Sequence, residues 1–312
     1  MIHLRSQQPR IFAIVLALAA TSMALAQTAS SGAPAASVVV RVGRLLDVRS
    51  GQYLTNVAMS VAGERIRAVG PADDIVKAAP VGAQVIDLGA ATVLPGLIDC
   101  HTHLMARIPD ERHGYEINLL TKSQAYRALE GAANARATLE AGFTSVRDVE
   151  NEGSGYADVA LRNAIREGLV AGPRMQVATR GIAAVGQYFP FRTSPDLAAF
   201  PTGAEMVSGV EEARRAVREQ LGRGADLIKI YADWSQPTLT IPEMEVVVQE
   251  AHRAKRKVAA HATTPEGIRN AVRAGVDSIE HPLTDRIAGA REDDRNLPSL
   301  PHGHLACRCR QG

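Results

Sequence analysis

One unit recurs four times along the chain and constrains its fold more than any other feature. In each copy the end of a helix leads through a turn into a short apolar strand that ends in a polar residue. The copies are residues 139–148, 221–229, 252–261 and 272–281. Alternating helices and strands of this kind predict a parallel sheet. In a β/α barrel the functional residues stand where the strands end. The polar residues at these ends are Asp148, Lys229, His261 and His281.

The region that holds this unit predicts most of a barrel. Six strands are expected, at residues 93–103, 144–149, 174–182, 226–232, 257–262 and 277–281. Helices are expected to start at Thr240 or Ile241 and at Thr264, because a capping residue followed by proline begins a helix. A complete barrel has eight strands. The expected fold class is therefore α/β, with a TIM-like (β/α) barrel over residues 93–283 that is incomplete, with about six of eight strands.

The chain before this region has a different character. Residues 38–92 carry short apolar strands separated by turn signals and predict a small N-terminal β-segment. Residues 27–37 are small and polar and are typical of a linker. Residues 1–26 combine a basic start, a short apolar core and Ala24-Leu25-Ala26, as a secretory signal peptide does. We expect cleavage after Ala26, no stable membrane span afterwards, and a secreted or periplasmic protein. An uncleaved anchor is the alternative.

Composition argues against a nucleic-acid-binding protein and against a disulfide-rich fold. The chain has 312 residues and a formal net charge of +2, with no charged run that would bind nucleic acid. Its three cysteines do not form a disulfide framework, because Cys100 lies inside an expected strand while Cys307 and Cys309 lie in the tail. That tail, residues 284–312, has no strand or amphipathic helix pattern, and we interpret it as aberrant.

His101-Thr102-His103 closes an apolar run and suggests metal chemistry. Side chains alternate along a strand, so Asp99, His101 and His103 are expected to share one face. A pair of histidines in a polar loop is the alternative. Neutral imidazoles on rigid strands suit Zn²⁺ or a similar cation. Lys229 would repel a cation unless CO₂ carboxylated its amine; otherwise it lines the pocket or pairs with a carboxylate.

These residues resemble a known family. Segments 93–103, 227–230, 260–262 and 278–282 are similar to the metal-dependent amidohydrolase superfamily, in its imidazolonepropionase-related branch that includes Xaa-Pro dipeptidases. The resemblance runs from about residue 38 to 283 and implies that residues 38–92 belong to a small β-sandwich. It also implies two divalent metal ions, with zinc expected. His101 and His103 would bind one ion, His261 and His281 the other, and carboxylated Lys229 would bridge them.

Further residues are candidates for supporting roles. Tyr231 shares the face of Lys229 and could donate to a substrate carbonyl or a tetrahedral intermediate, or simply line the barrel. Tyr188 and Arg180 are candidates for binding substrate. Asp99 and Asp148 are expected to orient histidines through hydrogen bonds.

The resemblance implies hydrolysis of a carbon–nitrogen bond in a dipeptide or cyclic amide by metal-activated hydroxide. The partner would be a small-molecule substrate, with a homo-oligomer left open. A lactonase or phosphotriesterase is one alternative, and an inactive truncated fragment is another. The family's general-base aspartate follows the eighth strand, and the sequence ends before such a strand. The aspartates near its end, Asp285, Asp293 and Asp294, stand in a different context.

Overall fold

The computed structural model describes residues 37–109, 111, 113–188, 196, 201–234 and 236–282. The expected signal peptide, nearly all of the linker, and the 284–312 tail with its aspartates and cysteines lie outside these residues. The chain divides into two compact units, residues 1–95 and 96–312. None of the described helices combines the length and the apolar character needed to cross a bilayer.

The first unit is one mixed sheet with a short helix. Its elements are β1 Ser37–Asp47, β2 Gln52–Ala62, β3 Arg65–Pro71, α2 Ala72–Lys77, β4 Gln84–Asp87 and β5 Thr92–Val93. β1 and β2 form an antiparallel hairpin, while β4 and β5 pair with β1 in parallel. Val39 and Ala58 pack with Ala72 of α2. The described part of this unit is one sheet and one helix, so the β-sandwich stays a prediction.

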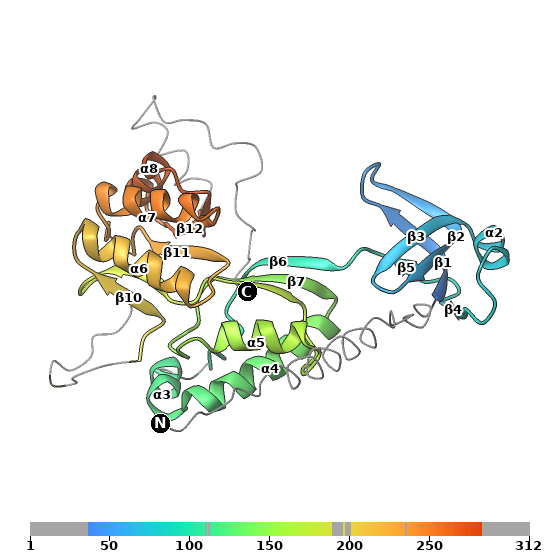
Figure 1. The fold of residues 1–312 in the computed structure, drawn as a ribbon, viewed down its shortest axis with the longest axis horizontal. Helices are drawn as coiled ribbons and strands as arrows, with labels where there is room; N and C mark the ends of the chain where they lie inside the picture. The colour runs from blue at the N-terminus through green and yellow to red at the C-terminus, as the bar shows by residue number, and fades with distance from the viewer. Residues whose placement is uncertain are drawn as a thin grey trace, which may run out of the picture. The chain divides into compact units, whose positions relative to one another are not determined.

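The second unit contains two parallel sheets. The first has the order β6-β7-β8, and the second has the order β10-β9-β11-β12-β13. The strands are β6 Leu97–Thr102, β7 Phe143–Asp148, β8 Arg174–Val177, β9 Gly181–Ala184, β10 Ala204–Val207, β11 Leu227–Tyr231, β12 Lys257–His261 and β13 Ser278–Glu280. The helices are α3 Gly114–Thr121, α4 Gln124–Glu140, α5 Ala157–Arg166, α6 Val210–Gly222, α7 Ile241–Arg253 and α8 Pro265–Ala274. α4 packs beside α5, and α7 packs beside both α6 and α8 (Figure 1).

The recurring unit of the sequence is confirmed as four helix-to-strand connections. They join α4 to β7, α6 to β11, α7 to β12 and α8 to β13. Each turn contains a residue with positive φ, which ends the helix sharply. These residues are Gly142, Gly224, Lys255 and Gly275. The two expected helix starts are also confirmed, because Thr240 and Thr264 are the N-caps of α7 and α8.

Two expected strands are interrupted. The strand expected over residues 93–103 is divided at Pro95, which supplies no backbone donor. β5 ends at Val93 and pairs with β1, while β6 begins at Leu97 and ends one residue before His103. The strand expected over residues 174–182 breaks between β8 and β9, where Thr179 has a φ of 63°. The segment from Arg174 to Ala184 therefore contributes to both sheets.

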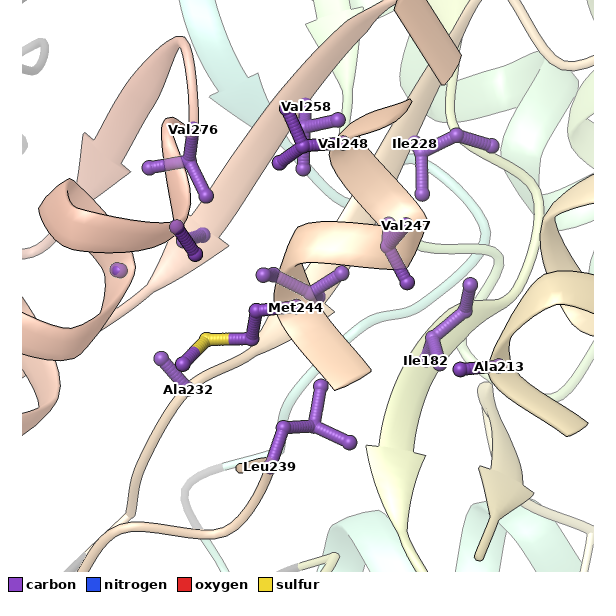
Figure 2. Packing of buried hydrophobic residues seen from close by; sticks show 14 of the residues in the cluster. Ile182, Ala213, Ile228, Ala232, Leu239, Met244, Val247, Val248, Val258 and Val276 are labelled. Atoms are coloured by element: carbon purple, nitrogen blue, oxygen red, sulfur yellow. The ribbon is translucent and has the colours of Figure 1, made fainter. Parts of the chain in front are cut away.

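The largest apolar cluster holds the second sheet against α6, α7 and α8 (Figure 2). Ile228 and Ile230 of β11 belong to this cluster, whereas Leu227 belongs to a separate one with Val149, Ala178 and Ala259. Alternation along β11 therefore places Lys229 and Tyr231 on the face of Leu227, away from the helices. The packed layer gives these two side chains a rigid support.

Asp233 ties the loop after β11 to the start of α8. Its buried carboxylate accepts from Thr263 N at 2.8 Å and Thr264 N at 2.7 Å, and from both threonine hydroxyls. Asp233→Ala should lower the free energy of unfolding by about 3 kcal/mol, because several buried donors lose a charged acceptor. Urea denaturation tests this. Arg136→Ala removes an exposed ion pair with Glu140 and should cost under about 0.5 kcal/mol; equal losses would contradict the prediction.

Candidate functional site

Four histidines meet at the strand ends of the second unit. The Nε2 atoms of His101 and His103 lie 3.2 Å apart. The ring centroid of His281 is 4.4 Å from that of His101 and 5.0 Å from that of His261. His281 follows β13 with a φ of 65°, a left-handed conformation that is uncommon outside glycine. Residues at the ends of β6, β12 and β13 thus bring four imidazoles into one cluster.

Lys229 of β11 lies beside this histidine cluster. Its side chain is 1% exposed, and its Nζ lies 5.6 Å from the ring centroid of Tyr231. Burial lowers the pKa of Lys229 to about 8, although Glu280 and Glu150 act in the opposite direction. Among the described residues, no carboxylate forms a salt bridge with it. The pairing considered as an alternative from the sequence is therefore not found there.

Three of the histidines are held neutral. Burial lowers the pKa of His101 to about 3, of His261 to about 2 and of His281 to about 4. Nearby Lys229 adds to the lowering in each case. A neutral imidazole keeps a lone pair on one ring nitrogen, which is the form that binds a metal ion.

His103 differs in charge. Burial acts to lower its pKa, but the carboxylates of Glu152, Glu150 and Asp148 outweigh this effect and raise the pKa to about 9. The buried carboxylates beside His103 therefore favour its protonated form, so a cation binding Nε2 of His103 would displace a proton there, whereas His101 is neutral. The Nε2–H of His103 can then donate to Nε2 of His101, in agreement with their 3.2 Å separation.

Two glutamates lie beside the outer nitrogens of the His-x-His pair, and of the two contacts only the one at His101 has hydrogen-bond geometry. Glu280 Oε2 lies 2.7 Å from Nδ1 of His101, and Glu152 Oε1 lies 2.7 Å from Nδ1 of His103. Arg147 Nη2 donates to Glu280 Oε1 at 2.7 Å. Burial raises the pKa of Glu280, but its hydrogen bond with His101 and the nearby positive charges of Lys229 and Arg147 outweigh burial and leave the pKa well below its usual range.

The structure does not place Asp99 and Asp148 in the expected role of orienting imidazole rings. Asp99 Oδ1 accepts from the backbone N–H of His101 at 3.0 Å. Asp148 Oδ2 accepts from Leu104 N at 2.6 Å and from the Thr102 hydroxyl at 3.2 Å. The pairing of β6 with β7 shifts register between Asp99 and Thr102, so simple alternation fails there. Both carboxylates fix the backbone around the histidines rather than their rings.

An aromatic wall adjoins His261. Trp234 stacks on Tyr231 with ring centroids 5.1 Å apart and lies 4.2 Å from the ring of His261. Tyr188 meets Tyr231 edge-on at 5.1 Å, and its hydroxyl donates to Glu150 Oε1 at 2.6 Å. The structure therefore brings Tyr188 and Tyr231 together beside the histidines.

Arg180 is directed elsewhere, because its Nη2 donates to the backbone carbonyl of Ala204 at 2.7 Å. Several residues of the site were not predicted from the sequence. They are Trp234, Arg147, Glu150, Glu152 and Glu280. Two signals could have found the glutamates: Glu280 directly precedes His281, and Glu150 and Glu152 continue the every-second-residue spacing from Asp148.

The donor chemistry of this cluster fits a divalent cation. Nε2 of His261 is buried and has no hydrogen-bond partner among the described residues. Such an orphaned nitrogen costs free energy unless a ligand occupies it. Within the described ranges, no three His, Cys, Asp or Glu side chains are arranged closely enough to hold an ion. The histidine cluster therefore fits a divalent cation by the chemical type and the burial of its side chains, and not by their spacing.

Comparison with known proteins assigns the family. The sequence pattern described as the amidohydrolase family matches residues 92–295, which is more than half of the chain. The chain belongs to the amidohydrolase family. Solved structures related to this amidohydrolase imply a TIM-like barrel with α/β content, as the parallel strands of its second unit also indicate.

Several known proteins are similar to this amidohydrolase over most of its length. An ochratoxinase from Aspergillus niger is 32% identical over 272 residues, which cover 79% of this chain and 54% of that enzyme. A Xaa-Pro dipeptidase with methionine in its active site has a TM-score of 0.68 and 29% identity, covering 83% of this chain and 65% of the other. A prolidase complexed with N-methylphosphonate-L-proline has a TM-score of 0.65 and 32% identity, with 82% and 64% covered. This amidohydrolase thus spans about half the length of the ochratoxinase.

Proposed function

We propose that this protein is a metal-dependent hydrolase of amide C–N bonds in small molecules, with a dipeptide or cyclic amide as substrate. The observation that carries the proposal is the meeting of four histidines with buried Lys229 at the ends of parallel strands. Family membership supports it, because amidohydrolases are generally metal-dependent. The names of its relatives, which include a prolidase, a dipeptidase and an ochratoxinase, favour amide substrates.

Five side chains would hold two divalent cations, with zinc proposed. His101 and His103 would bind one ion, His261 and His281 the other, and Lys229 would bridge them once carboxylated. In that step the neutral amine of Lys229 forms an N–C bond to CO₂, one C=O π bond opens onto oxygen, and the proton lost from Nζ passes to solvent water. Because burial lowers the pKa of Lys229, a larger fraction of this lysine is in the neutral amine form that reacts with CO₂. When bound, the ions would polarise the scissile carbonyl and lower the pKa of the attacking water.

The chain's own residues would then select and orient the substrate. Trp234 and Tyr231 offer a stacked apolar surface beside His261, suited to a proline ring or another compact apolar group. The Tyr231 hydroxyl is a candidate donor to the carbonyl oxygen of the scissile bond. Tyr188, held by Glu150, would limit the site on the other side of Tyr231.

Metal dependence and substrate class can be tested together. The metal-free protein is incubated with Zn²⁺ and bicarbonate and assayed on Xaa-Pro dipeptides, N-acyl amino acids, cyclic amides, lactones and organophosphates. We expect amide hydrolysis that falls to background with a chelator and returns with Zn²⁺. Faster turnover of lactones or organophosphates would favour the alternative reaction, and activity that resists complete chelation would overturn metal dependence.

A further inference from the structure

We propose that Glu280 is a positioning residue that fixes His101 in its Nδ1–H tautomer and so keeps the lone pair on Nε2, where it can bind a cation. A carboxylate can only accept, so the 2.7 Å contact between Glu280 Oε2 and His101 Nδ1 requires a proton on Nδ1. The Glu280 side chain is 1% exposed, and water therefore cannot readily replace this contact. This role rests on the proposed metal-dependent function.

Glu280 is itself held in one orientation. Its other oxygen, Oε1, accepts from Arg147 Nη2 at 2.7 Å and from the Ser278 hydroxyl at 2.8 Å. Arg147 is anchored in turn, because its Nε donates to the Cys100 carbonyl at 2.7 Å and its Nη1 to Ser278 Oγ at 3.2 Å. The two carboxylate oxygens thus have separate partners, one for His101 and one for the Arg147–Ser278 pair.

This network connects His101, the proposed metal ligand, to residues on three strands. Arg147 belongs to β7, Glu280 to β13 and His101 to β6, so the network also joins the three-stranded sheet to the last strand of the five-stranded sheet. A purely structural ion pair between Arg147 and Glu280 would join the sheets without affecting the histidine. The tautomer of His101 therefore separates a positioning role from a structural one.

Glu280→Gln gives a specific expectation. Glutamine has one carbonyl oxygen, and Arg147 and Ser278 both donate to the position that this oxygen would occupy. The amide NH₂ would then face His101 and donate to Nδ1, which moves the ring proton to Nε2. Protonation of Nε2, the nitrogen aimed at His103, removes the lone pair with which His101 would bind the cation. We expect Zn²⁺ affinity to fall about 10–100-fold, as for other partners of metal-binding histidines.

The experiment measures the tautomer in metal-free protein. Long-range ¹H–¹⁵N correlation on ¹⁵N-histidine-labelled protein reports which ring nitrogen carries the proton, and the peaks missing in His101→Asn assign it. Competition with a chromophoric chelator gives the Zn²⁺ affinity. Glu250→Gln is the matched control, because Glu250 is a similarly enclosed carboxylate that accepts from Arg214, Arg218 and Arg253 on the helices. It should change neither quantity.

The outcomes are separable. A proton on Nε2 of His101 in the unmodified protein overturns the inference without any variant, so the test survives if Glu280→Gln fails to fold. An unchanged tautomer in Glu280→Gln also overturns it, even if Zn²⁺ binds. If the tautomer switches as expected but the unmodified protein binds no Zn²⁺, the proposed function fails while the control of His101 by Glu280 is upheld.

Discussion

Lys229→Ala is expected to lower kcat/KM for amide hydrolysis by at least about 10³-fold. The reason is that a bridging carbamate would hold both cations, and loss of metal-assisted charge stabilisation costs several kcal/mol of transition-state free energy. Lys229 is enclosed beside Tyr231 and has no salt bridge with any described carboxylate. Its removal should therefore act on the cations rather than through a broken ion pair.

Steady-state hydrolysis with metal analysis tests this prediction. Lys257→Ala is the control, because Lys257 lies on neighbouring β12, is 73% exposed and pairs with Asp277; it should keep full activity. Formate, acetate or propionate should partly restore the Lys229→Ala variant by supplying a carboxylate in place of the carbamate. Wild-type turnover in Lys229→Ala without added acid would reject the bridging role.

His261→Leu should lower the amount of bound metal without lowering the stability of the metal-free protein. Replacing the imidazole removes a ligand, so bound Zn²⁺ should fall from about two ions to one or fewer per chain. The same change removes a buried nitrogen that has no partner in the described structure. Leucine is apolar and of comparable size, so the metal-free variant should be as stable as the wild type or more stable by about 1 kcal/mol.

Elemental analysis and thermal denaturation of metal-free protein measure the two effects. His252→Leu is the matched control, because His252 lies on α7, is partly exposed and pairs with Asp277 at 2.7 Å. This control should bind metal normally and lose a little stability. Normal zinc content in His261→Leu would remove His261 from the proposed ligands.

Local features of this fold were predictable, and contacts between distant segments were not. The starts of α7 and α8 follow from capping residues and prolines only a few positions apart. The order of helices and strands around His261 and His281 follows in the same way. The apolar run before His101 predicts one continuous strand, but Pro95 divides it because proline supplies no backbone donor.

The site shows the same division. The histidines were predicted because each lies at or directly after the end of an apolar strand pattern, which is visible in the sequence. Their glutamate partners were missed because His101 and Glu280 are 179 positions apart and only folding brings them together. The position of Asp99 two residues before His101 predicts this role for it, but the pairing of β6 with β7 shifts register there and the Asp99 carboxylate accepts from the backbone of His101 instead.

The left-handed backbone of His281 lowers the stability of the fold, although the proposed metal site needs a histidine at this position. A φ of 65° costs a histidine of the order of 1 kcal/mol that glycine would avoid and asparagine would reduce. Laboratory evolution that rewards heat resistance alone should therefore enrich glycine or asparagine at position 281, whereas a screen that also demands bound metal should retain histidine. Position 281 is thus a place where a thermostability screen would select against the proposed activity.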